Sequence, residues 1–213
     1  MSDSLEEKLV ECVENDNTAG FERILTSFDF RVLKNNDRVT LPLVGALGRA
    51  CEKGNADIVR LILAQQSLAN VGYHCDNKTN ADRPLLTAAY HGHINVVKTL
   101  LSQSDIDINR KNGAGATAFH MAAMSNNLNI VKLLVRDSRL RLEDTYTVGI
   151  PALHYAARNG HTEVVMYLLD LYPISVITKS YYGRTASQAG AENGNYGISK
   201  MILSHVAQQP HYF

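Results

Sequence analysis

Short runs of apolar residues recur along the chain at the spacing of an amphipathic helix. In two of these runs the apolar positions fall together on one face of a helix, which predicts a single buried stripe. The positions are Val164, Val165, Leu168 and Leu169 in one run, and Ile130, Val131, Leu133 and Leu134 in the other.

A second kind of helix precedes these runs and carries a pair of alanines. Ala156 and Ala157 are one such pair, and their small side chains predict close packing against neighbouring helices. Gly160 follows, where a left-handed turn would end the helix. The next residue, His161, stands where a cap would start the second helix. The same position is held elsewhere by Asn55, His93, Asn127 and Asn195.

The predicted helix pairs repeat in phase. The segment PLLTAAYHGHINVV at 84–97 is nearly copied by PALHYAARNGHTEVV at 151–165, and TAFHMAAMSNNLNIV at 117–131 lies between them. Such self-similarity is the signature of a stacked repeat array. The turn positions Gly92, Asn126, Gly160 and Gly194 are 34 residues apart, whereas Asp16 and Gly54 each precede the next turn by 38.

These copies resemble the ankyrin repeat, with consensus G-x-T-P-L-H-x-A-A-x-x-G-H-x-E-V-V-x-L-L, most closely over residues 82–170. The resemblance implies an all-α solenoid of stacked antiparallel helix pairs with projecting hairpin-like finger loops, forming a single domain over 1–213. Terminal repeats with polar substitutions are expected to be caps, although a segment cut from a longer protein would end in the same way. The repeats are expected at 1–30 (a weakly matching cap), 41–70, 79–111, 112–145, 146–179 and 180–213 (a cap or truncation).

Finger loops are expected between the helix pairs. Ile106 and Ile108 alternate with polar residues before the Asn-Gly step at 112–113, which favours a short hairpin. Two fingers are predicted to be lengthened, at about 28–43 and 67–83, which explains the 38-residue intervals. Extra length on one face accompanies binding in some repeat proteins and is tolerated insertion in others.

Composition and charge exclude several classes of partner. The 21 basic residues balance the 21 acidic ones, so the net charge predicts no attraction to nucleic acid or to anionic membranes. The N-terminal residues lack the pattern of a secretory signal, and the apolar runs are too short for membrane insertion. Cys12, Cys51 and Cys75 form no close pair, which favours reduced thiols and a cytoplasmic location.

The sequence offers little support for chemistry. His120 and His154 recur at the fourth place of the T-P-L-H-like motif, where the resemblance implies hydrogen bonding within and between repeats, and no Cys/His cluster has zinc spacing. No nucleophile elbow, P-loop or metalloprotease motif is present, and Cys51 replaces a core alanine. Arginines at 136, 139 and 141 are interspersed with acids, which favours a solvated finger over a phosphate site. We therefore expect no enzyme activity, no cofactor and no metal.

Partner-binding residues follow from the resemblance. Ankyrin domains contact partners with finger tips and with the exposed ends of first helices, which together line a concave groove. The candidates here are rich in aromatic and arginine side chains, which dominate protein interfaces. They are Tyr90, His91, Met124, Ser125, Tyr146, Val148, Arg158, Asn159, Tyr181, Tyr182, Arg184 and Glu192.

The function expected from the sequence is binding of another protein by a chain that is monomeric by itself. Ankyrin arrays resembling this one also occur in effectors that intracellular bacteria deliver into host cells, which would place the chain in the host cytoplasm. The alternative is a regulatory or targeting segment of a larger enzyme or channel. Asn109 resembles the ankyrin asparagine that oxygen-dependent hydroxylases modify, which would make the chain a substrate.

Overall fold

The computed structural model describes residues 2–27, 40–64, 84–141, 151–171 and 176–208. Twelve α-helices and no strand occur within these ranges, so the prediction of an all-α repeat fold is confirmed. The contacts divide the chain into two compact units, Met1–Asp107 and Ile108–Phe213, and each is described by itself. The repeat boundaries and the single domain stay predictions.

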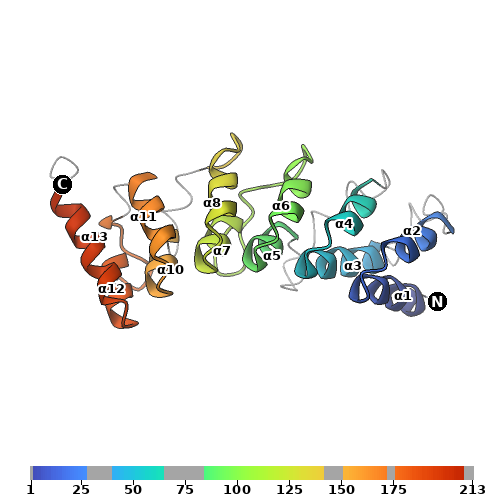
Figure 1. Cartoon of the computed structure of the whole chain (residues 1–213), viewed down its shortest axis with the longest axis horizontal. Helices are drawn as coiled ribbons and strands as arrows, with labels where there is room; N and C mark the ends of the chain where they lie inside the picture. The colour runs from blue at the N-terminus through green and yellow to red at the C-terminus, as the bar shows by residue number, and fades with distance from the viewer. Residues whose placement is uncertain (1, 28–39, 65–83, 142–150, 172–175, 209–213) are drawn as a thin grey trace. The chain divides into compact units, whose positions relative to one another are not determined.

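Three helix pairs form the first unit. Within each pair the two helices pack together, the first helices stack in the order α1, α3, α5, and the second helices stack in the order α2, α4, α6 (Figure 1). The bounds are α1 Ser2–Glu14, α2 Thr18–Ser27, α3 Thr40–Lys53, α4 Ala56–Leu63, α5 Pro84–His91 and α6 Ile94–Leu101.

The second unit repeats this arrangement. Its first helices stack in the order α7, α10, α12, and its second helices in the order α8, α11, α13 (Figure 1). The bounds are α7 Ala118–Met124, α8 Leu128–Val135, α10 Ala152–Arg158, α11 Thr162–Leu171, α12 Ala186–Glu192 and α13 Tyr196–Gln208. Each unit is therefore a layer of first helices on a layer of second helices.

The alanine pairs make the close packing of first helices possible. Ala156 and Ala157 of α10 are completely buried, as is the corresponding pair of α7, Ala122 and Ala123. A methyl side chain at these positions lets adjacent helices approach closely, and any larger residue would overpack the contact. The apolar stripes of the second helices are buried as predicted, including Val164 and Val165 of α11.

The turn inside every helix pair has a left-handed residue. The φ angle is positive at all six predicted turn positions, where it costs glycine little and other residues more. Four of the positions hold glycine, and asparagine and aspartate hold the other two, both of which tolerate this region better than most side chains. The residues and angles are Asp16 (52°), Gly54 (82°), Gly92 (80°), Asn126 (62°), Gly160 (82°) and Gly194 (81°).

The residue after each turn is predicted to cap the second helix, but in some repeats its side chain bonds to the preceding repeat instead. Asn55 does cap α4, because its side-chain oxygen accepts from the Ile58 N–H. His93 makes no side-chain cap; instead its Nε2 lies 2.7 Å from the carbonyl oxygen of Glu52 in the preceding repeat. Helix C-termini leave carbonyls without intrahelical partners, so a donor from the next repeat is favourable there. His93 therefore stands at the predicted cap position of α6, but its side chain joins two repeats and does not cap the helix.

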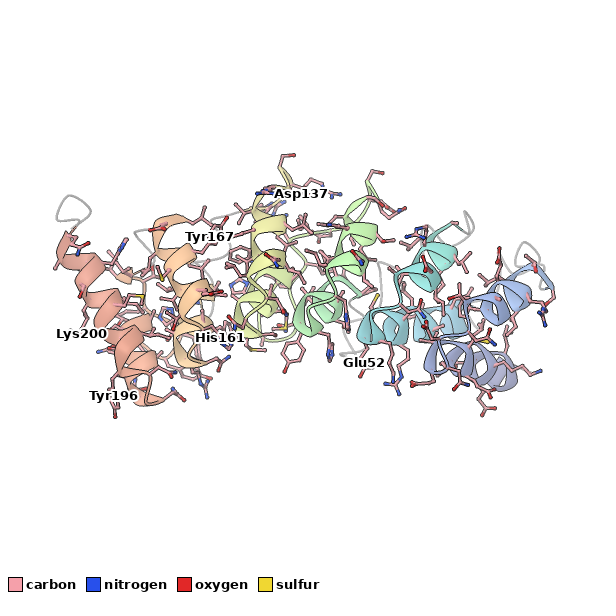
Figure 2. The ribbon with its side chains drawn as sticks, in the orientation of Figure 1. Glu52, Asp137, His161, Tyr167, Tyr196 and Lys200 are labelled. Carbon is pink, nitrogen blue, oxygen red and sulfur yellow. The ribbon has the colours of Figure 1, made fainter. Side chains whose placement is uncertain are left out.

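The same bridge recurs in the second unit. His161, labelled in Figure 2, places Nε2 2.8 Å from the carbonyl oxygen of Met124. Asn195 donates from Nδ2 to the carbonyls of Ala157 and Arg158, at 3.0 and 2.8 Å. These hydrogen bonds join consecutive repeats across 37 and 38 residues of sequence.

The described fingers at 112–116 and 180–184 are tight turns closed by backbone hydrogen bonds. The N–H of Asn112 donates to the Ala116 carbonyl at 2.8 Å, and the N–H of Ser180 donates to the Arg184 carbonyl at 2.8 Å. Of the two fingers predicted to be long, residues 28–39 and 67–83 lie outside the described residues. Residues 40–43 already belong to α3, so the predicted first finger extends too far.

Glycine-to-alanine substitutions at two equivalent turns should differ in cost. Gly194→Ala adds a Cβ that meets nothing within 4 Å, so we expect a loss of about 1 kcal/mol from left-handed strain alone. Gly160→Ala places its Cβ 3.0 Å from Oδ1 of Asn195, and moving that amide weakens the bridge to α10. We expect a loss of about 2 kcal/mol or more in urea unfolding. Equal losses would contradict a role for the bridge.

Asn126→Gly is the matched control for this comparison. Asn126 already has φ of 62°, so glycine removes strain there and should change stability by less than about 1 kcal/mol, in the stabilising direction.

Candidate functional site

A surface cleft of about 430 Å³ lies in the second unit, between α10, α12 and the turn before α12. It contains four of the residues predicted from the sequence, namely Arg158, Tyr182, Arg184 and Glu192. The remaining lining residues are His154, Tyr155, Ser180, Ala189 and Asn193.

The repeat geometry explains why these side chains meet. Because Ala156 and Ala157 face the neighbouring helices, Tyr155 and Arg158, which are three positions apart, share the outer face of α10. The turn before α12 is closed by a hydrogen bond from the Gly183 N–H to the Ser180 carbonyl, at 2.8 Å. This turn holds Tyr182 at the mouth of the cleft with 70% of its surface exposed.

His154 fixes the floor of the cleft. The side chain is buried, and its Nε2 lies 2.7 Å from the carbonyl oxygen of Arg184, which joins α10 to the next finger turn. The prediction that this histidine bonds between repeats is confirmed. Its Nδ1 is buried and has no hydrogen-bond partner.

The missing partner of His154 Nδ1 has a cause in the sequence. At the equivalent place in α7, the hydroxyl of Thr117 lies 2.9 Å from Nδ1 of His120, inside the repeat. Pro151 occupies that place in α10 and offers no hydroxyl. Burial lowers the pKa of His154, and the hydrogen bond to the Arg184 carbonyl opposes this effect only in part. The imidazole is therefore neutral at neutral pH.

Charges inside the cleft are only partly balanced. The guanidinium of Arg184 forms an ion pair with the carboxylate of Glu192. Burial raises the pKa of Tyr155, the nearby Tyr182 adds to the rise, and Arg158 opposes it. Within the described residues, Arg158 has no carboxylate at ion-pair distance.

The other predicted residues of the second unit differ in what their side chains do. Tyr181 is 84% exposed and packs edge-on against Tyr182, with ring centroids 5.4 Å apart. The amide of Asn159 donates to the Met124 carbonyl at 2.9 Å, so it supports the stack. The hydroxyl of Ser125 donates to the Met121 carbonyl of its own helix.

Tyr90 and His91 belong to the first unit, and Tyr146 and Val148 lie outside the described residues. Tyr90 is 44% exposed and its ring meets that of His91 edge-on. His91 also lines a separate cleft of about 410 Å³ with Arg49 and Glu52 of α3. The residue set predicted from the sequence is therefore spread over two separately described units.

The cleft of the first unit is bordered by ion pairs. Glu14 lies 2.8 Å from Nζ of Lys53 and also pairs with Arg49. The hydrogen bond from Lys53, followed by that from Arg49, lowers the pKa of Glu14 although the side chain is well solvated. Arg49 in turn lies 2.7 Å from Glu52. Both cations here, Arg49 and Lys53, are thus paired with carboxylates, in contrast to Arg158, and Glu6 adds a further carboxylate to the lining.

Tyr155 is one of five lining residues outside the set predicted from the sequence, and the one whose aromatic side chain suits an interface. It stands within the HYAAR segment of α10, three residues before Arg158, and this spacing alone places both on one helix face. Its neighbours His154 and Ala156 belong to the buried motif, which made a position in the cleft hard to predict for Tyr155.

The described residues contain no group of His, Cys, Asp or Glu side chains that could hold a metal ion. Cys51 is completely buried, and burial strongly raises the pKa of its thiol, which suits the predicted role in the core. Asn109 donates from Nδ2 to the Arg139 carbonyl and accepts from the Arg141 N–H, both at 2.8 Å. Its amide is thus tied to the next finger, and a modifying enzyme would have to open that contact.

The fold and this surface define a class of protein: a stacked helix-pair solenoid that presents side chains from helix ends and finger turns. The profile of the ankyrin repeats matches in three copies, over residues 9–112, 47–145 and 119–211, and the chain belongs to the ankyrin repeat family. Ankyrin repeats are generally protein–protein interaction modules, and the fold is typically non-catalytic. Comparison with curated proteins gives no match. In the part of the chain that is described, no helix is long and apolar enough to cross a membrane.

The lowered pKa of His154 predicts an acid-sensitive stability. The free energy of unfolding is greatest above pH 6.5, the ordinary pKa of imidazole, because the His154 side chain is neutral there in both the folded and the unfolded chain. Below that pH the unfolded chain takes up a proton that the buried ring resists, so stability falls until the pH passes the lowered folded pKa. Urea unfolding between about pH 7.5 and about pH 5 measures this loss.

His154→Gln is the control for this prediction. Gln188 occupies the equivalent place in α12, so glutamine fits the motif there. The variant should have a flatter pH dependence over the same range, and an unchanged dependence would show that other groups cause the loss.

Proposed function

We propose that the chain binds a partner protein through the cleft of the second unit and the tyrosines beside it. The observation that supports this proposal is the convergence of Arg158, Tyr182, Arg184 and Glu192 from two helices and a turn onto one opening. Arginine and tyrosine are the residue types that most often dominate binding energy. The surface is used for recognition, and no catalytic step is required.

The cleft is suited to recognition because it is held in place before a partner arrives. The hydrogen bond from His154 to Arg184 and the ion pair from Arg184 to Glu192 restrain its two walls. A partner then pays little ordering entropy on this side of the interface. The neighbouring exposed pair, Tyr181 and Tyr182, extends the binding surface with two rigid aromatic rings.

We further propose that binding occurs in a reducing cytoplasm, which would be that of a host cell if the chain is a delivered bacterial effector. The free thiols of Cys12 and Cys51 support this location. The chain is proposed to act as a monomer that meets a different protein.

The double substitution Arg158→Ala with Tyr182→Ala tests the function. The intact chain should capture a specific partner from a lysate of its own or its host's cells. Once that partner is purified, the variant should bind it about 30-fold more weakly or worse, because two interface anchors are lost. Titration calorimetry gives the ratio.

The matched control is Glu163→Ala with Met166→Ala, which changes two exposed residues of α11 that do not line the cleft. The control should bind as the intact chain does, and circular dichroism should show equal helicity for all three proteins. Full binding by the Arg158 and Tyr182 variant would place the interface elsewhere and overturn the proposal.

A further inference from the structure

The second-unit cleft has chemistry that selects one kind of partner group. It contains two arginines and one acid, and the acid, Glu192, is already paired with Arg184. His154 is neutral, because burial lowers its pKa. Arg158 is therefore the cation that remains without an ion-pair partner among the described residues. The cleft has an excess of about one positive charge.

Hydroxyl donors accompany this free cation. Burial raises the pKa of Tyr155, so its phenol is protonated and can donate a hydrogen bond. Tyr182 lines the same cleft as Tyr155, so both phenols border one opening. A guanidinium beside two phenolic O–H groups is a donor-rich environment suited to a group that only accepts hydrogen bonds.

We infer that the cleft receives the carboxylate of an Asp or Glu side chain, presented by an acidic segment of the partner protein between Arg158, Tyr155 and Tyr182. This inference rests on the proposed function and names its partner chemistry. The single free charge favours a carboxylate over a doubly charged phosphate. A lysine side chain would meet Arg158 with like charge and is disfavoured.

The size and openness of the site fit a short segment of chain. A volume of about 430 Å³ is at the lower end of ligand sites and accommodates one acidic side chain with part of its backbone. Outside the opening, the edge-on pair of Tyr181 and Tyr182 offers apolar ring surface to the next residue of the segment. The segment thus has an acidic residue with an apolar or aromatic residue beside it.

Defined peptide pools test this inference with the intact chain. Each pool fixes one central residue as Glu, Gln, Lys or phosphoserine and varies the flanking positions among Tyr, Leu, Ser and Gly. Fluorescence anisotropy of labelled pools should show the Glu pool binding about tenfold more tightly than the neutral Gln pool of the same shape, and should show no binding of the Lys pool. Equal binding of the Glu and Gln pools overturns the inference.

Reversing the charge of Arg158 is the stricter test of the inference. Arg158→Glu should abolish the preference for the Glu pool and create one for the Lys pool. Arg136→Glu makes the same change in net charge at an exposed residue of the same unit that does not line the cleft, and should leave the preference intact. If both variants lose the preference equally, the attraction is a general field and the inference fails.

The remaining outcomes are also decisive. Binding of the phosphoserine pool without the Glu pool would identify a phosphopeptide site and overturn the carboxylate assignment. Binding of no pool below about 1 mM overturns it as well. Arg158→Gln, which keeps a long polar side chain, replaces the reversal variant if that one fails to fold, and should remove the Glu preference without creating one for Lys.

Failure here differs from failure of the proposed function. Suppose that the Arg158→Ala and Tyr182→Ala variant no longer binds the purified partner, but the intact chain shows no preference for the Glu pool. The cleft then binds its partner through a group other than a carboxylate. If that variant keeps its partner, the proposed function itself fails, whatever the pools show.

Discussion

A left-handed turn between the two helices of each repeat makes both the helix pair and its stacking possible. Its positive φ lets the second helix fold back on the first, and it places the following residue against the preceding repeat. His93, His161 and Asn195 use that position to donate to carbonyls at first-helix ends. One backbone conformation therefore shapes each helix pair and also joins the pairs.

The hydrogen bonds between repeats also hold the surface side chains around the cleft in place. Because the carbonyls at the end of α10 are bonded by Asn195, the end of the helix is fixed while the side chain of Arg158 remains outside the core. His154 joins the same helix to the carbonyl of Arg184 in the next turn. The groups that stabilise the stack thus also position the cleft, and the buried, unpartnered Nδ1 of His154 lies beside it.

The two clefts show how similar repeats acquire different chemistry. In the first unit Glu14 pairs with Arg49 and Lys53, so the cations are satisfied within the protein. In the cleft of the second unit, the ion pair between Arg184 and Glu192 leaves Arg158 available, and aromatic residues replace the acids around it. The helical framework is the same, and the difference comes from exposed side chains that folding does not require.

The helix pairs, the six turn positions and the core stripes could be predicted from the chain alone, because they follow from local spacing of alanine, glycine and apolar residues. Repeat register, which carries surface positions from one copy to the next, also put Arg158, Tyr182, Arg184 and Glu192 among the candidate binding residues. Only the tertiary structure decided that these four share one opening with Tyr155, and that Asn159 serves the stack. The hydrogen bonds and the shared cleft join residues about one repeat apart in the sequence. No local pattern therefore determines which donor bonds to which carbonyl, or which charged side chain has no ion-pair partner.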